Sequence, residues 1–175
     1  MMAPRTRRYW LYAGAAVGAA AVGGAAAWWG GARGGAAGVL PEDTLWAQQW
    51  TALDGSPLPM EGLRGRPTVV NFWATWCPPC VGEMPDIQRM YAKYGDKVHF
   101  VIVNIDGTKP DVTAFMENHA FSFPVALDTN GSAASAYAVQ AIPTSYIIDA
   151  DSNVVDSHIG ALSAGDMESF VTSAF

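Results

Sequence analysis

Cysteine is scarce in this sequence. Its 175 residues contain two cysteines, Cys77 and Cys80, together with three histidines scattered along the chain. A structural zinc site needs four ligands, usually from two cysteine pairs or from one pair with closely spaced histidines. Covalent haem attachment needs a histidine directly after the second cysteine, where this chain has Val81. The sequence argues against both kinds of site, and we expect no metal and no cofactor.

Basic residues are also few, and they are unevenly distributed. From Glu42 onward the chain has six Lys and Arg against sixteen Asp and Glu, which is a net charge of −10. A nucleic-acid-binding domain needs a basic surface that can neutralise phosphates. We therefore expect no nucleic-acid partner, and the excess of acidic residues is explained most simply by solubility.

Charge is absent from the stretch between Tyr9 and Ala32, which is 24 residues long. As a helix it would be about 36 Å long, against about 30 Å for the hydrocarbon core of a bilayer. Arginines at positions 5, 7 and 8 precede it and favour a cytoplasmic N-terminus. We predict that residues 1–32 are an N-terminal membrane anchor in contact with lipid, with the rest of the chain outside the cytoplasm.

Two other interpretations of this N-terminal segment remain open. Ala25–Ala27 could form the small-residue cleavage site of a secretory signal peptide. Thr6–Leu11 resembles a twin-arginine export signal, which is an address rather than an anchor. All three interpretations place the following domain outside the cytoplasm. Residues 33–44, rich in glycine, are typical of a flexible linker, and residues 45–175 are long enough for one domain.

The rest of the sequence alternates between strand and helix patterns. Strands are predicted over residues 45–53, 68–73, 98–105, 144–148 and 154–159, with a short apolar run at 124–127. Helices are predicted from Cys77 to about Tyr94 and over residues 111–119, 132–137 and 164–170. Strands separated by helices, followed by a hairpin and a last helix, predict an α/β fold: a mixed central sheet with helices on both faces. The continuous apolar run at 98–105 predicts a central strand that is covered on both sides.

The two cysteines lie where the predicted strand at 68–73 gives way to a helix. Unsatisfied N–H groups and the positive end of the dipole at a helix N-terminus favour the thiolate, which is the nucleophile in disulfide exchange. Two cysteines separated by two residues can close into a disulfide and open again. A purely structural disulfide would stabilise little, because so short a loop removes little entropy from the unfolded chain. The pair therefore predicts redox chemistry.

The sequence around the cysteines resembles a known family. Asn71–Cys80 reads NFWATWCPPC, Glu83–Pro85 follows it, and a second similar segment is Tyr137–Asp149. Together they resemble the TlpA/ResA-like family of membrane-tethered thiol-disulfide oxidoreductases, which implies a thioredoxin-like fold. The similarity covers about residues 45–170. Members of the neighbouring CcmG type usually carry Glu after the loop proline, where this chain has Thr144.

Roles for the reacting residues follow from the resemblance and from chemistry. Cys77, nearer the end of the helix, would attack the substrate disulfide, and Cys80 would resolve the mixed disulfide. Ordinary thioredoxins carry a buried acid six residues before the first cysteine, where this chain has Asn71. Glu83, three residues after Cys80, would receive the Cys80 proton instead. The alternative role for Glu83 is a stabilising charge in the first turn of the helix.

A substrate-binding surface around the cysteines is also implied by the resemblance. Pro143 would follow a cis peptide bond, and backbone groups of Ile142 would pair with the substrate chain. Trp76, Pro78 and Pro79 would lie on its rim. Because the two prolines have no N–H, they supply no donor to the attacking sulfur, which favours a reducing role over that of a strong oxidant.

These features together predict an enzyme that reduces disulfides in exported proteins, including those of cytochrome c or oxidase maturation. The expected location is a bacterial inner membrane, crossed once, with the catalytic domain in the periplasm. The resemblance implies an integral membrane thiol-electron donor of the DsbD/CcdA type as the reductant. Two alternatives remain: a thiol oxidase or isomerase that uses the same residues, and a copper-handling chaperone for oxidase assembly whose two thiolates hold Cu(I).

Overall fold

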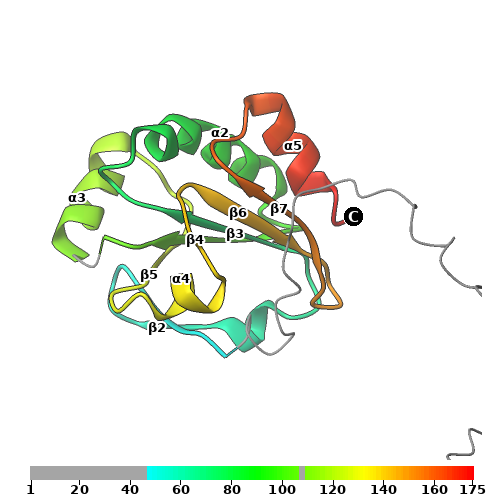
Figure 1. Ribbon diagram of the computed structural model, residues 1–175, viewed down its shortest axis with the longest axis horizontal. Helices are drawn as coiled ribbons and strands as arrows, with labels where there is room; N and C mark the ends of the chain where they lie inside the picture. Colours follow the sequence, from blue (N-terminus) through cyan, green and yellow to red (C-terminus); the bar gives the residue numbers. More distant parts are fainter. Residues whose placement is uncertain (1–46, 107–108) are drawn as a thin grey trace, which may run out of the picture. The chain divides into compact units, whose positions relative to one another are not determined.

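A mixed sheet of seven strands forms the centre of the protein, in the order β2-β1-β5-β4-β3-β6-β7 (Figure 1). The computed structural model describes residues 47–106 and 109–175. The strands are β1 (Gln49–Ala52), β2 (Pro57–Pro59), β3 (Thr68–Trp73), β4 (His99–Asn104), β5 (Val125–Leu127), β6 (Thr144–Ile148) and β7 (Val154–Ile159). The helices are η1, a 3₁₀ helix (Met60–Leu63), α2 (Pro78–Tyr94), α3 (Lys109–His119), α4 (Ser132–Ala136) and α5 (Ala164–Thr172).

The predicted α/β fold is confirmed for the described residues. β3 pairs in parallel with β4 and antiparallel with β6, so the sheet is mixed. β4 lies in the middle of the sheet, and five of its six residues are buried. A strand covered on both faces is what a continuous apolar run predicts.

The first predicted strand differs from the structure. Within the described residues it is β1, which turns back through Gly55 to pair with a second short strand, β2. Gly55 has a φ of 91°, a conformation that favours glycine. The sequence did not predict β2 because Pro57 and Pro59 argue against a strand. A proline-containing strand is tolerated at the edge of a sheet, which is where β2 lies.

Helices cover the two faces of the sheet unequally (Figure 1). Apolar residues of α2, α3 and α5 pack on one face, where the core includes Met84, Ile87, Met90, Val112, Met116, Met167, Phe170 and Val171. On the other face η1 and α4 contribute Met60 and Ala133, with Tyr137 just after α4. The helix that follows the cysteines is thus held by the larger of the two cores.

α2 ends at Tyr94, as predicted. Gly95 follows the last helical residue, and its φ of −63° is an ordinary right-handed value. A Cβ added at Gly95 would lie 2.6 Å from the carbonyl oxygen of Tyr91. Glycine is therefore needed here for close packing rather than for a left-handed turn.

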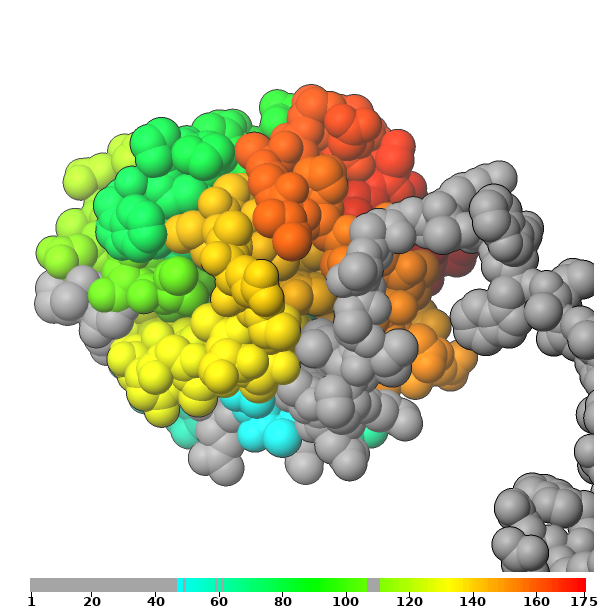
Figure 2. Space-filling model, in the orientation of Figure 1, coloured from blue at the N-terminus to red at the C-terminus, as the bar shows by residue number. Residues whose placement is uncertain are grey.

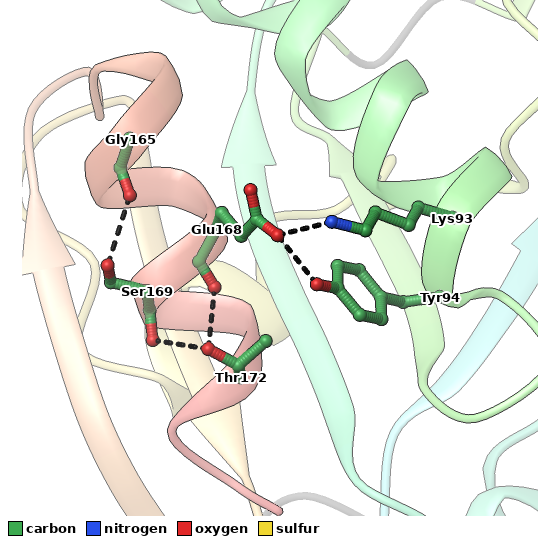
Figure 3. Close-up of polar contacts among 6 residues, drawn as sticks. All are labelled: Lys93, Tyr94, Gly165, Glu168, Ser169 and Thr172. Atoms are coloured by element: carbon green, nitrogen blue, oxygen red, sulfur yellow. Dashed lines mark hydrogen bonds and ion pairs between the residues drawn. The ribbon is translucent and has the colours of Figure 1, made fainter.

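Polar contacts join α5 to α2 on the surface (Figure 3). The carboxylate of Glu168 accepts hydrogen bonds from Lys93 Nζ at 2.5 Å and from the Tyr94 hydroxyl at 2.7 Å. Within α5, the hydroxyls of Ser169 and Thr172 donate to carbonyl oxygens one turn earlier, at 3.1 and 2.9 Å. Because the ion pair is exposed, it contributes little by itself, and the buried core carries most of the contact between the helices.

The predicted anchor or export signal at residues 1–32 and the predicted linker at residues 33–44 lie outside the described residues. The first two residues of the predicted domain, 45 and 46, also lie outside them. In the part of the chain that the structure describes, no helix combines the length and the hydropathy that a membrane span requires.

Candidate active site

The cysteines lie where β3 leads into α2, as predicted. Cys77 is the N-cap of α2, and its Sγ accepts a hydrogen bond from the Cys80 N–H at 3.3 Å. Pro78 and Pro79 occupy the first two helical positions and have no N–H. The Cys80 amide is therefore the first N–H of the helix that can reach the Cys77 sulfur.

Cys77 and Cys80 form a disulfide, with an S–S distance of 2.01 Å and a Cα–Cα distance of 5.3 Å. Cys80 is fully buried, whereas Cys77 keeps 4% of its surface exposed. Trp76 is 68% exposed, and Pro78 and Pro79 are also exposed. The part of the pair nearest to the surface is therefore Cys77, which lies among these three exposed side chains in the sequence.

The loop before β6 places backbone groups beside Cys77. The Ile142–Pro143 peptide bond is cis, as the family resemblance implies. The Ile142 carbonyl oxygen lies 3.8 Å from Cys77 Sγ. The Gly160 N–H donates to the Pro143 carbonyl oxygen at 2.8 Å, which ties the loop to the end of β7. Figure 2 shows this loop, coloured gold, on the surface between the green residues of α2 and the orange residues that follow β7.

Glu83 and Asn71, the two predicted supporting residues, are in direct contact. Glu83 is 2% exposed, and Asn71 Nδ2 donates to its Oε1 at 2.8 Å. The Leu162 N–H donates to the other carboxylate oxygen, Oε2, at 3.0 Å. Burial raises the pKa of Glu83, the hydrogen bonds from Leu162 and Asn71 act in the opposite direction, and the nearby Asp86 carboxylate raises it further. Glu83 is therefore a buried carboxyl group placed one turn after Cys80, with two donors holding its oxygens.

Two contacts of this buried group were missed by sequence reasoning. Asn71 Nδ2 also donates to Ser145 Oγ at 2.9 Å, and the Leu162 amide contacts Glu83 from the loop before α5. Ser145 is a polar residue within the strand predicted at 144–148, and that was the one available signal. Nothing in the local sequence marks Leu162, because it contributes through its backbone.

A second group of polar contacts, also missed, holds the segment between β3 and α2. The Asp106 carboxylate accepts hydrogen bonds from the Thr75 N–H at 3.0 and 3.2 Å. Asn104 Nδ2 donates to the same carboxylate at 3.2 Å, and its Oδ1 accepts from the Asp106 N–H at 2.9 Å. These contacts tie the residues before Trp76 to the end of β4. The orientation of the cysteine motif therefore depends on the neighbouring strand.

The described residues, 47–106 and 109–175, contain no cluster of metal-ligating side chains. No group of three or more His, Cys, Asp or Glu in these ranges lies close enough to hold a metal ion. His99 is bound by Arg66 at the beginning of β4, the end away from the cysteines, and its pKa is lowered by burial and by that guanidinium. His119 stacks on Phe115 in α3, with ring centroids 4.2 Å apart.

Known proteins share this fold and this sequence pattern. A family model described as Redoxin matches residues 38–173. A thiol-disulfide oxidoreductase ResA of Bacillus cereus is 35% identical over 122 residues, which cover 69% of this chain and 70% of that protein. The structure of MTB dsbF has a TM-score of 0.70 at 31% identity and covers 78% of this chain and 99% of that one. A secreted Mycobacterium tuberculosis disulfide oxidoreductase homologous to E. coli DsbE has a TM-score of 0.68 at 25% identity, with 76% and 99% covered.

Proposed function

Because the chain belongs to the Redoxin family, and within it to the TlpA/ResA-like thioredoxin-fold thiol-disulfide oxidoreductases, we propose that it reduces disulfide bonds in exported proteins. The observation that carries this proposal is the Cys77–Cys80 disulfide at the N-terminus of α2, with the Ile142 carbonyl 3.8 Å from Cys77 Sγ. Cys77 thus retains some exposed surface, Cys80 is fully buried, and the Ile142 carbonyl lies beside the first of them.

The reaction is a dithiol–disulfide exchange. In the reduced enzyme, the Cys77 thiolate attacks one sulfur of the substrate disulfide, so that the enzyme–substrate S–S bond forms as the substrate S–S bond breaks. The substrate thiolate that leaves takes up a proton. Cys80 then loses its proton to Glu83 and attacks Cys77 Sγ, so that the Cys77–Cys80 bond forms as the mixed disulfide breaks. The second substrate sulfur leaves as a thiolate and takes up a proton, and Glu83 gives up the proton that it received. Two electrons pass from the enzyme to the substrate.

The substrate chain would lie along the cis-proline loop. Backbone groups of Ile142 would pair with an extended substrate segment, because main-chain hydrogen bonds serve substrates of many sequences. The exposed side chains of Trp76, Pro78 and Pro79 would form an apolar rim around Cys77. This arrangement supports protein substrates rather than a single small molecule.

The oxidised enzyme must be reduced again after each cycle. We propose a dithiol donor in the membrane, of the DsbD/CcdA type, and a catalytic domain that faces an extracytoplasmic space. The sequence pattern of the N-terminus supports this location, and one of the similar proteins is described as secreted. A membrane-bound donor can reach a tethered domain on the same side of the membrane.

The reduction potential of the pair tests the direction of the reaction. The full chain, equilibrated with glutathione in detergent, is expected to have a potential nearer to thioredoxin, about −270 mV, than to the strong oxidant DsbA, about −120 mV. The reason is that Pro78 and Pro79 leave few N–H donors to stabilise the Cys77 thiolate. A potential near the oxidant end would reject the reductase proposal in favour of the oxidase or isomerase alternative.

The location is tested by fractionation. Expressed whole in a Gram-negative host, the protein should stay in the membrane after a carbonate wash, keep its N-terminus and expose its domain to protease added to the periplasm. Replacement of Arg7 and Arg8 by lysine keeps the positive charge but disrupts a twin-arginine signal. If the segment is an anchor that does not use such a signal, this replacement should leave the location unchanged. A soluble periplasmic product that begins near Trp28 would show a cleaved signal peptide instead of an anchor.

A further inference from the structure

Ser145 lies beside the buried polar residues of the active site. Asn71 of β3 and Ser145 of β6 are directly opposite each other in the antiparallel pair, so their side chains project from the same face of the sheet. α2 packs over this face and brings Glu83 into contact with Asn71. Each of the three side chains is at most 2% exposed. Ser145 is therefore part of a closed group rather than of the surface.

The side-chain amide of Asn71 is held through its nitrogen. Nδ2 carries two hydrogens and donates to Glu83 Oε1 at 2.8 Å and to Ser145 Oγ at 2.9 Å. Its Oδ1 is buried and, within the described residues, has no hydrogen-bond partner. The orientation of the amide therefore depends on the two acceptors of Nδ2. If Ser145 lost its hydroxyl, Glu83 would be the one remaining acceptor.

The orientation of this amide matters for the protonation of Glu83. Burial favours the neutral carboxylic acid, whereas the donors of Asn71 and Leu162 favour the carboxylate. In the proposed reaction Glu83 must be a carboxylate when Cys80 gives up its proton. An Asn71 amide that turns away from Glu83 would remove one of the two donors and leave more of Glu83 protonated.

We propose that Ser145 is a positioning residue for proton transfer at Cys80. Its hydroxyl holds the Asn71 amide so that Nδ2 points at Glu83, and the carboxylate of Glu83 is thereby kept ready to accept the proton. Ser145 itself touches no reacting atom in this scheme. The inference rests on the proposed function, in which Glu83 takes the Cys80 proton, and it adds a residue on β6 to the site.

Other titratable groups lie on the elements packed around Glu83. From α2 these are Asp86 and the reduced cysteine thiols. From β7 it is His158, which lies directly opposite Ser145 on the same face of the sheet, and α5 contributes Asp166 in its first turn. The residues of β3 and β6 on this face are not titratable. Substitutions at Ser145 leave all of these groups in place, so matched variants isolate the effect of the hydroxyl.

The test compares Ser145→Thr with Ser145→Val, two side chains of the same shape that differ in one hydroxyl. The rate of insulin disulfide reduction by the full chain is measured from pH 5 to 9. The threonine variant should keep the wild-type profile. The valine variant should move the acid limb to higher pH by about half to one unit and slow the reaction at pH 7 by about three- to tenfold. A valine profile identical to that of threonine would overturn the proposal.

Two controls separate positioning from a general loss of structure. Thr68→Val removes a buried hydroxyl from the far end of β3 and should leave the profile unchanged. In a Glu83→Gln background, Ser145→Val should have no further effect, because the positioning acts through Glu83. Equal effects of Ser145→Val in the wild-type and Glu83→Gln backgrounds would reject the positioning role.

If the valine variant does not fold, Ser145→Ala, which adds no volume, should give the same shift of the acid limb relative to wild type. An inactive wild-type protein would instead reject the proposed function.

Discussion

Replacement of Cys77 by serine is expected to reduce disulfide reduction to the rate measured without enzyme. Cys77 is the sulfur that retains exposed surface and lies beside the Ile142 carbonyl, whereas Cys80 is fully buried. A serine hydroxyl is not ionised at neutral pH and forms no bond equivalent to a mixed disulfide, so the first step of the exchange is lost. The measurement is reduction of insulin disulfides by the full chain with dithiothreitol as the electron source.

Cys80→Ser is the matched control for this prediction. It removes the same disulfide but leaves the Cys77 thiol, so the variant should attack a substrate and remain bound to it. Non-reducing electrophoresis should reveal covalent complexes with Cys80→Ser and none with Cys77→Ser. The stability of both variants is compared with that of the reduced wild type, because neither can form the disulfide. Complexes trapped by Cys77→Ser instead would reverse the assignment of the attacking cysteine.

Glu83→Gln is expected to slow disulfide reduction by about 10²- to 10⁴-fold, the usual contribution of general acid–base catalysis. Glutamine keeps the shape of the side chain and an oxygen that can accept from Asn71 or Leu162, but it cannot take the Cys80 proton. The pH profile should also change, because the variant lacks the titratable carboxyl group that takes the Cys80 proton in the proposed reaction. Wild-type rates from pH 6 to 9 would show that Glu83 acts only as a charge near the helix end.

A second substitution can show that Glu83→Gln is slow because it lacks a carboxyl group that accepts the proton. Asn71 donates directly to Glu83, so a carboxylate at position 71 would lie in the same buried group. Asn71→Asp in the Glu83→Gln background should therefore restore part of the rate. Asn71→Leu in the same background, which has a similar size and no charge, should restore nothing. Equal rates for the aspartate and leucine variants would contradict the acid–base role.

The stability of Glu83→Gln provides an internal check on its fold. Burial raises the pKa of Glu83 in the native state above its value in the unfolded chain. Protonated Glu83 then stabilises the folded state. This stabilisation is complete below the pKa that Glu83 has in the unfolded chain, and it is lost as the pH rises through the pKa that Glu83 has in the native state. Glutamine does not titrate, so the free energy of unfolding of Glu83→Gln should rise relative to wild type between acid and neutral pH. Urea unfolding at several pH values measures this difference.

The fold class and the reacting pair could be predicted because local patterns carry them. The strands predicted at 68–73, 144–148 and 154–159 coincide with β3, β6 and β7. Alternation of strands and helices restricts the topologies that a chain can adopt, and two cysteines separated by two residues at a strand-to-helix junction have few other uses. The N-terminal segment, by contrast, is a prediction from hydropathy and charge that fractionation must test.

By itself the sequence determined that Cys77 and Cys80 begin a helix and that Glu83 follows one turn later, because spacing along one helix is a local property. Tertiary structure alone decided what surrounds them. The Asn71–Ser145 contact joins residues 74 apart in the chain, and the Glu83–Leu162 contact joins residues 79 apart. Such contacts depend on strand register and on the packing of α2 over the sheet. Neither is set by any short stretch of sequence, since each arises from the balance of many buried contacts at once.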